Sequence, residues 1–208
     1  MVQKELGAKK RGRPRAYDPD AALDSALEVF WRAGYASASI DDICSATGMN
    51  RPSVYAAFGD KRALFRSAIE RYKAISREQM SWAFSGDRSL RETLTGVYDR
   101  ALDMYFSERS TPLGCFLLGA ALTPAFEDEE IRELMNSGLR EFEIAFRRQI
   151  KIAQKNGEIG KERSADGLAK MAAATLYYLA IRSRAGEKRS ELANYAKFSV
   201  EFICESAA

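Results

Sequence analysis

Apolar residues recur along this chain three or four positions apart, which is the spacing of amphipathic helices, and no convincing polar–apolar alternation suggests a strand. The first apolar face lies between residues 19 and 33. Asp18-Pro19 before it is typical of an N-cap followed by proline at the first helical position. Gly34 after it is typical of a helix end. The pattern therefore predicts an all-α protein.

Two short helices come after this first one. Ser39 can cap a helix that Gly48 ends, with Asp42 where a capping box places its acid. A further helix runs from about Asn50 to Phe58, because proline is tolerated in a first turn. Helices this short are not stable alone, so neighbouring helices must brace them.

Longer helical patterns fill the rest of the chain. They cover about 61–82, 89–105, 127–155, 165–184 and 188–205, with a further apolar segment at 115–122. The segment 165–184 is apolar on nearly all sides and must be covered on more than one of them. The final segment carries a single apolar seam.

Composition narrows the class of protein. The chain has 208 residues, 46% hydrophobic and 29% charged, which is typical of a globular protein. No apolar stretch reaches 18 residues and no signal peptide is visible, so no membrane association is expected. Three scattered cysteines favour a reducing cytoplasmic compartment. Since histidine is absent and no metal-ligand or phosphate-loop spacing occurs, we expect no enzyme, metal or cofactor.

Charge points to a polyanionic partner. All of the formal net charge of +3 lies within residues 1–66, because acidic and basic residues balance in the rest of the chain. An arm at residues 1–17 contains Arg11, Arg13 and Arg15 in the sequence RGRPR, which resembles an AT-hook core that enters an A·T-rich minor groove. The alternative is a solvated basic tail that adds only counterion release.

The short helices at residues 39–58 have the spacing of a helix-turn-helix, whose second helix can enter a major groove about 12 Å wide. A bundle corner without any DNA role has the same spacing. The residues favour the first interpretation, because the stretch SIDDICSATGMNRPSVYAAFGDKRALF and its surroundings (about residues 16–66) resemble the N-terminal domain of the tetracycline-repressor (TetR) family. The matching residues are Ala26, Phe30, Gly34, Ser39, Ile43, Gly48, Arg51 to Tyr55, Phe58, Lys61 and Leu64.

The resemblance implies roles for individual residues. The helix after Asn50 would be the recognition helix, with Arg51 and Ser53 facing base edges. Pro52 would present a compact apolar surface to a thymine methyl group. The implied phosphate contacts are Tyr55, Ser39 and Lys61.

The resemblance also implies a domain order: the arm at 1–17, a DNA-binding domain at 18–66, and a helical ligand-binding and dimerisation domain at 67–208. A small apolar or aromatic ligand would bind among aromatic residues of the second domain, although ordinary core packing explains the same composition. The candidate lining residues are Phe106, Phe116, Phe126, Met135, Phe142, Tyr177 and Tyr178. Cys115 reads as a buried structural cysteine, with a redox-sensing thiol as the alternative.

The last two helices are predicted to form a four-helix bundle with those of a second copy. An ordinary hairpin at the end of the domain is the alternative. The candidate interface residues are Leu168, Thr175, Leu179, Leu192, Tyr195, Ser199 and Phe202.

Together, these expectations predict a homodimeric transcriptional repressor that binds a palindromic double-stranded operator and is released from it by a ligand. The main alternative is an architectural protein that binds A·T-rich DNA without ligand control. A helical enzyme is the least favoured interpretation, because the usual catalytic residue types are missing.

Overall fold

The computed structural model describes residues 18–85, 87–107 and 111–205, and no strand occurs among them, which confirms the all-α prediction. No described helix is both long enough and apolar enough to cross a bilayer. The elements are α1 (Pro19–Ser37), α2 (Ile40–Thr47), α3 (Arg51–Phe58), α4 (Lys61–Ser81), α5 (Leu90–Tyr105), the π-helical turn η1 (Leu117–Ala121), α6 (Pro124–Glu127), α7 (Glu129–Asn156), α8 (Ala165–Arg184) and α9 (Arg189–Ile203).

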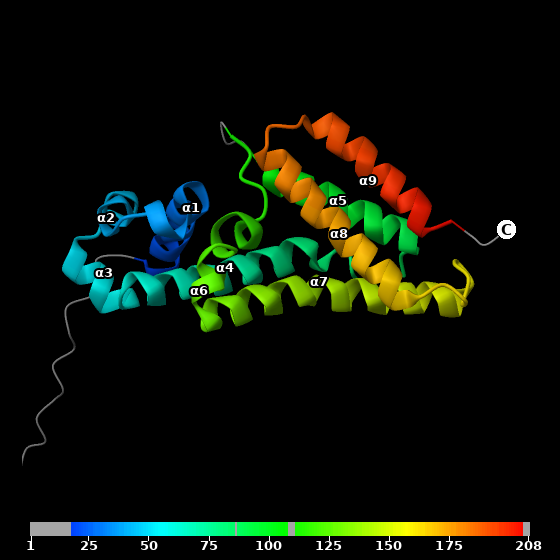
Figure 1. Ribbon diagram of the computed structural model, residues 1–208, viewed down its shortest axis with the longest axis horizontal. Coiled ribbons are helices and arrows are strands. Elements are labelled where there is room, and N and C mark those ends of the chain that lie inside the picture. The colour runs from blue at the N-terminus through cyan, green and yellow to red at the C-terminus, as the bar shows by residue number, and fades with distance from the viewer. Residues whose placement is uncertain (1–17, 86, 108–110, 206–208) are drawn as a thin grey trace, which may run out of the picture.

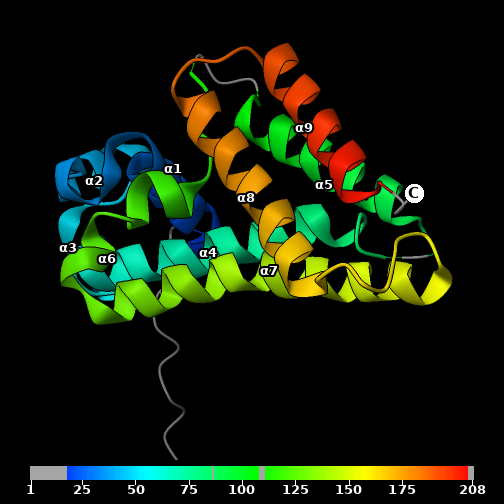
Figure 2. The same cartoon turned by 45° about the vertical axis from the view of Figure 1, so that its right-hand side comes forward.

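The helices form two groups joined by α4. Helices α1, α2 and α3, here called the head, gather at one end of α4 (Figure 1). Helices α5, α7, α8 and α9, here called the body, lie towards its other end, where α5 and α7 pack against α4, and α7 runs alongside α4 in both views (Figures 1 and 2). Because α4 belongs to both groups, it connects them without a flexible linker.

The predicted helix boundaries agree closely with the structure where a local capping interaction determines them. Ser39 and Ser89 each form the predicted capping box, with Asp42 and Glu92 respectively. The end of α1 differs from the prediction. Gly34 interrupts the helix with φ 77° and ψ 167°, as glycine readily does, but one more turn continues to Ser37, and the Ala38 N–H donates to the Gly34 carbonyl over 3.2 Å.

A first hydrophobic core fills the head and continues into the body. Phe65 of α4 lies 5.0 Å from Phe30 and 5.7 Å from Phe116, measured between ring centroids. Trp31 meets Tyr72 edge-on at 5.1 Å. Since Phe116 comes from the segment before η1, this core crosses the sequence position where the head was expected to end.

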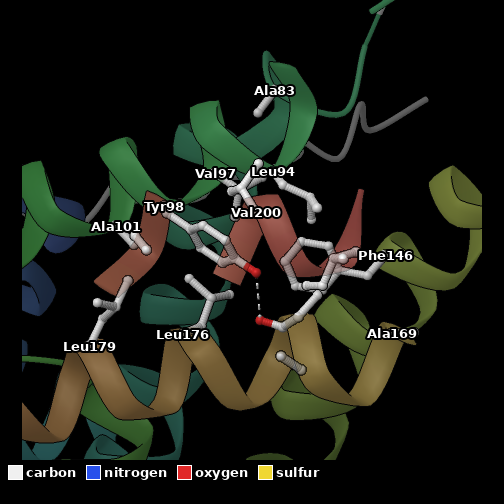
Figure 3. Close-up of a cluster of buried hydrophobic side chains, with 14 of the residues drawn as sticks. Ala83, Leu94, Val97, Tyr98, Ala101, Phe146, Ala169, Leu176, Leu179 and Val200 are labelled. Atoms are coloured by element: carbon white, nitrogen blue, oxygen red, sulfur yellow. Dashed lines mark hydrogen bonds between the residues drawn. The ribbon is translucent and has the colours of Figure 1, made fainter. Parts of the chain in front are cut away.

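A second core lies between α5, α7, α8 and α9. Tyr98 and Phe146 are fully buried at its centre, and the Tyr98 hydroxyl donates to the Ala172 carbonyl over 3.1 Å (Figure 3). Leu94, Val97, Leu176, Leu179 and Val200 surround them. Because this core is closely packed, it holds the helices that line the cavity and form the exposed faces in fixed positions.

Candidate nucleic-acid interface

The turn between α2 and α3 is fixed by local chemistry. Gly48 ends α2 with φ 69°, a left-handed conformation that suits glycine. The Asn50 side chain then caps α3 by accepting from the Ser53 N–H over 2.9 Å, and Pro52 stands in the first turn. Val54 is fully buried and anchors the inner face of α3. The outer face of this eight-residue helix is thereby held towards solvent.

The outer face of α3 presents three residues that were predicted from the sequence to contact DNA. Arg51 and Pro52 are exposed, and Tyr55 is 46% exposed, while Ser53 is half-buried. An arginine, a proline ring and a phenol on one rigid edge provide a forked donor, an apolar surface and a hydroxyl. The geometry suits a groove-reading helix.

Arg51 already has a partner that the sequence analysis missed. Its Nε donates to Asp41 Oδ1 over 2.7 Å and its Nη2 to Asp41 Oδ2 over 2.5 Å, so the first turn of α2 and the edge of α3 are joined. Hydrogen bonding to Arg51 lowers the pKa of Asp41, and the same bonds raise the pKa of Arg51. Both side chains remain largely exposed, so the pair is accessible to a competing ligand.

The two other assigned phosphate contacts also make contacts within the chain. The Ser39 hydroxyl donates to Asp42 Oδ2 over 2.6 Å and accepts from the Asp42 N–H over 3.1 Å. The Lys61 ammonium donates to the Ala36 carbonyl over 3.3 Å and lies 4.8 Å from the Tyr35 ring centroid. Their phosphate contacts stay predictions. Arg11, Arg13 and Arg15 lie outside the described residues.

An ion-pair cluster joins α4 to α7 next to the head. Arg62 donates to Asp128 Oδ2 over 2.5 Å, to Asp128 Oδ1 over 3.0 Å and to Glu130 over 3.1 Å, and Arg66 also pairs with Glu130. Asp128 also caps α7 by accepting from the Glu130 and Ile131 N–H groups. Hydrogen bonding to Arg62 lowers the pKa of Asp128 to about 2. The spacing of residues within each helical segment did not predict this ion-pair cluster.

A cavity of about 100 Å³ lies between α4 and the body helices α5, α7 and α8, with Cys115 and Leu117 also in its lining. Of the seven candidate ligand residues, Phe142 and Tyr177 line it, and burial raises the pKa of Tyr177 to about 12. Tyr72 and Met104 also line it, although the sequence did not single them out.

The other five candidate ligand residues lie elsewhere. Phe116 and Met135 are buried in the core of the head, and Phe106 packs against the core of the body. Phe126 is 87% exposed, and Tyr178 faces outward from α8. These residues were chosen for their aromatic or apolar side chains, but composition does not say which neighbour each side chain meets.

Cys115 lines the cavity, and burial raises the pKa of its thiol. A raised pKa disfavours the thiolate on which redox sensing depends, so the structural interpretation of this cysteine is preferred. Within residues 18–85, 87–107 and 111–205, no cluster of three or more His, Cys, Asp or Glu residues could hold a metal ion.

An apolar face remains exposed on α8 and α9. The rings of Tyr178 and Tyr195 lie 4.2 Å apart on it, Phe198 is 64% exposed, and Ile181 and Phe202 are also exposed. The sequence analysis missed Phe198 and Ile181. Exposed apolar side chains gathered in this way are a common feature of surfaces that bind other proteins.

Two of the seven candidate interface residues lie at this face, and two more are buried next to it. Tyr195 and Phe202 are on it, and Thr175 and Ser199 line a shallow groove beside it. The prediction is wrong for Leu168, Leu179 and Leu192, which are buried inside the chain. Their side chains face the core of the body, because α5 and α7 cover that side of α8 and α9.

Comparison with known proteins gives matches that agree with this geometry. Residues 22–68 match the model of bacterial regulatory proteins of the tetR family. The HTH-type transcriptional repressor ComR of Escherichia coli (strain K12) is 30% identical over 189 residues, which cover 90% of each chain. The HTH-type transcriptional repressor BdcR of the same strain is 32% identical over 107 residues, 51% of this chain and 54% of that one.

A solved structure extends the match to nearly the whole chain. A cysteine mutant of the TetR family transcriptional regulator CifR, complexed with 26bp double-strand operator DNA, shares 30% identity with this chain. The two structures superpose with a TM-score of 0.83, covering 91% of this chain and 98% of that chain.

Proposed function

This chain belongs to the tetR family of bacterial regulatory proteins and is a DNA-binding transcriptional regulator, and we propose that it is a ligand-relieved repressor that binds a palindromic operator as a homodimer. The observation that carries the proposal is the outer edge of α3. Arg51, Pro52 and Tyr55 face solvent there, while Val54 fixes the helix from the opposite side.

On the operator, Arg51 and Ser53 read base edges and Pro52 contacts a thymine methyl group. Arg51 exchanges the Asp41 carboxylate for the O6 and N7 atoms of a guanine, since its planar fork fits either acceptor pair. Tyr55, Ser39 and Lys61 contact phosphates and set the register. The arm with Arg11, Arg13 and Arg15 adds contacts in the neighbouring minor groove.

The second copy packs on the exposed face of α8 and α9. A two-fold axis through this face brings together two copies of Tyr195, Phe198 and Phe202, as an isologous interface requires. The two α3 helices then reach successive major grooves about 34–36 Å apart. A palindromic site follows from this symmetry.

The cavity supplies the site for a small apolar or aromatic ligand. Its lining includes Tyr72 and Met80 of α4, whose first residue is Lys61 beside the head. A ligand that favours one orientation of α4 by about 1–3 kcal/mol alters the fit of the head to DNA. The division at residues 18–66 and 67–208 then separates a DNA-binding domain from a ligand-binding and dimerisation domain.

Selection of DNA from a random-sequence pool by the full chain tests the proposal. The expected product is a motif with two-fold symmetry, bound by two protomers per duplex in sedimentation measurements. Footprinting on that duplex should show discrete protection of both half-sites. Diffuse coverage of A·T-rich DNA would instead favour the architectural alternative, and a monomer without duplex preference would exclude both.

A further inference from the structure

The break in α1 places a helix end beside the buried residue Trp31. The regular part of α1 stops at Gly34, so the carbonyl of Trp31 lies in its last regular turn. Carbonyls in such a turn commonly take donors from outside the helix, and a cation there is favoured by the helix dipole. A donor therefore has both a hydrogen-bonding and an electrostatic reason to approach.

Arg184 is that donor, and it comes from the far end of the sequence. It is the last residue of α8, and its Nη1 donates to the Trp31 carbonyl over 3.2 Å and to the Leu113 carbonyl over 3.2 Å. One guanidinium thus joins α8, the segment before η1 and the head. Since α8 also carries part of the exposed apolar face, Arg184 connects that face directly to α1.

Two glycines allow α8 and the segment around η1 to come this close. A Cβ at Gly119 of η1 would stand 2.7 Å from Arg184 Nη1 and 3.4 Å from its Cζ. A Cβ at Gly114 would overlap the Ala180 carbonyl oxygen of α8, and Gly114 has φ +64°. Any larger residue at 119 must displace the Arg184 side chain from its present position.

The same segment borders the cavity. Cys115 and Leu117 lie between Gly114 and Gly119, and both line the cavity of the body. Cys115 also borders the hollow beside Arg184. A ligand that displaces Cys115 or Leu117 would therefore act on the backbone against which Arg184 is packed.

We propose that Arg184 is a positioning residue that sets the orientation of the head relative to the α8–α9 face, and so the spacing of the two α3 helices in the dimer. This inference rests on the proposed dimeric operator binding. Arg184 acts through the carbonyls of Trp31 and Leu113 and contacts no DNA itself. A change of its contacts alters operator affinity while the protomers stay folded and paired.

Two substitutions and their combination test the role. Arg184→Met removes the donor but keeps a long apolar stem, and Gly119→Ala keeps the arginine but pushes its guanidinium aside. Arg140→Met, at an exposed arginine of α7, is the matched control. Each full-length variant is measured for affinity to the duplex that the unmodified chain selects, for dimerisation by sedimentation, and for its melting temperature.

We expect Arg184→Met and Gly119→Ala each to weaken operator binding about tenfold, with dimerisation unchanged, and Arg140→Met to bind normally. Because both substitutions break the same contact, the double variant should bind no more weakly than Arg184→Met alone. Arg184→Lys should recover part of the affinity, since an ammonium can still donate to one of the carbonyls.

Normal operator affinity of Arg184→Met would overturn the proposal, and so would additive losses in the double variant. If the melting temperature of Arg184→Met is well below that of the control, the test depends on Gly119→Ala alone. Normal operator affinity of Gly119→Ala would then overturn the proposal. A failure of the unmodified chain to bind any duplex as a dimer is a separate result, which contradicts the proposed function.

Discussion

The guanidinium of Arg51 and the carboxylate of Asp41 form a two-bonded ion pair, at 2.7 and 2.5 Å, on the exposed edge of the helix-turn-helix. The fork that holds Asp41 is the one that we propose reads a guanine, so in the free protein this proposed base reader is held in a competing contact. Asp41 also brings a negative charge to a surface that must approach phosphates. Both effects oppose DNA binding.

Replacing Asp41 by asparagine should therefore tighten operator binding several-fold at fixed salt, because both the competition and the repulsion of phosphates are reduced. Fluorescence anisotropy with the selected duplex measures the change, and Asp99→Asn, at an exposed aspartate of α5, is the control. Weaker binding by the Asp41 variant would show instead that Asp41 holds Arg51 in its reading orientation.

Arg51→Lys should separate base reading from charge. Lysine keeps the cation but lacks the planar fork, so affinity for the selected duplex should fall by about 5- to 150-fold. The slope of log K against log[salt] should stay close to that of the unmodified chain, because the number of neutralised phosphates is unchanged. Equal discrimination at every base position before and after the change would contradict the assignment of Arg51 as a base reader.

The basic arm should contribute its positive charge together with the proposed minor-groove contacts. Replacing Arg11, Arg13 and Arg15 together by alanine should weaken operator binding and flatten the salt slope by at most about 3, since each phosphate contact contributes about 0.9. The measurement is affinity between low and moderate salt. An unchanged slope would exclude phosphate contacts by these three arginines.

Asp128 should make stability depend on pH in the acid range. Its pKa in the folded chain, about 2, lies below the ordinary value of 3.8, so its contribution is present above about pH 4 and is lost as the pH falls towards 2. Asp128→Asn keeps a capping oxygen but removes the charge that Arg62 binds. Urea unfolding should show this variant less stable at about pH 7 and nearly equal to the unmodified chain at about pH 2. A difference that does not vary with pH would argue against the ion pair.

Tyr98→Phe tests the core of the body. The change removes the hydroxyl that donates to the Ala172 carbonyl over 3.1 Å and leaves the ring in place. The free energy of unfolding should fall by about 1 kcal/mol, the usual net value of one such hydrogen bond. Tyr55→Phe, at the exposed edge of α3, should leave the free energy of unfolding nearly unchanged. Equal effects of the two substitutions would mean that the buried bond contributes nothing measurable.

The sequence by itself determined the helices and most of their ends. Asp18, Ser39, Asn50 and Asp60 cap helices through bonds to N–H groups two or three residues away, so the spacing of a few residues contains the whole interaction. The outer edge of α3 was predictable from similarly local information, because Val54 and Phe58 share one face of this short helix and pack towards the core. The end of α1 was not, since Gly34 breaks the helix but does not dictate the conformation of the next residues.

Only the tertiary structure decided which surfaces meet. Leu179 and Phe198 both lie on apolar helical faces, yet one is buried in the body and the other is exposed, because periodicity defines an apolar face but not the neighbour that covers it. The bonds of Arg62 to Asp128 and of Arg184 to Trp31 span 66 and 153 positions of sequence. Contacts over such separations depend on the path of the whole chain, which local spacing does not encode.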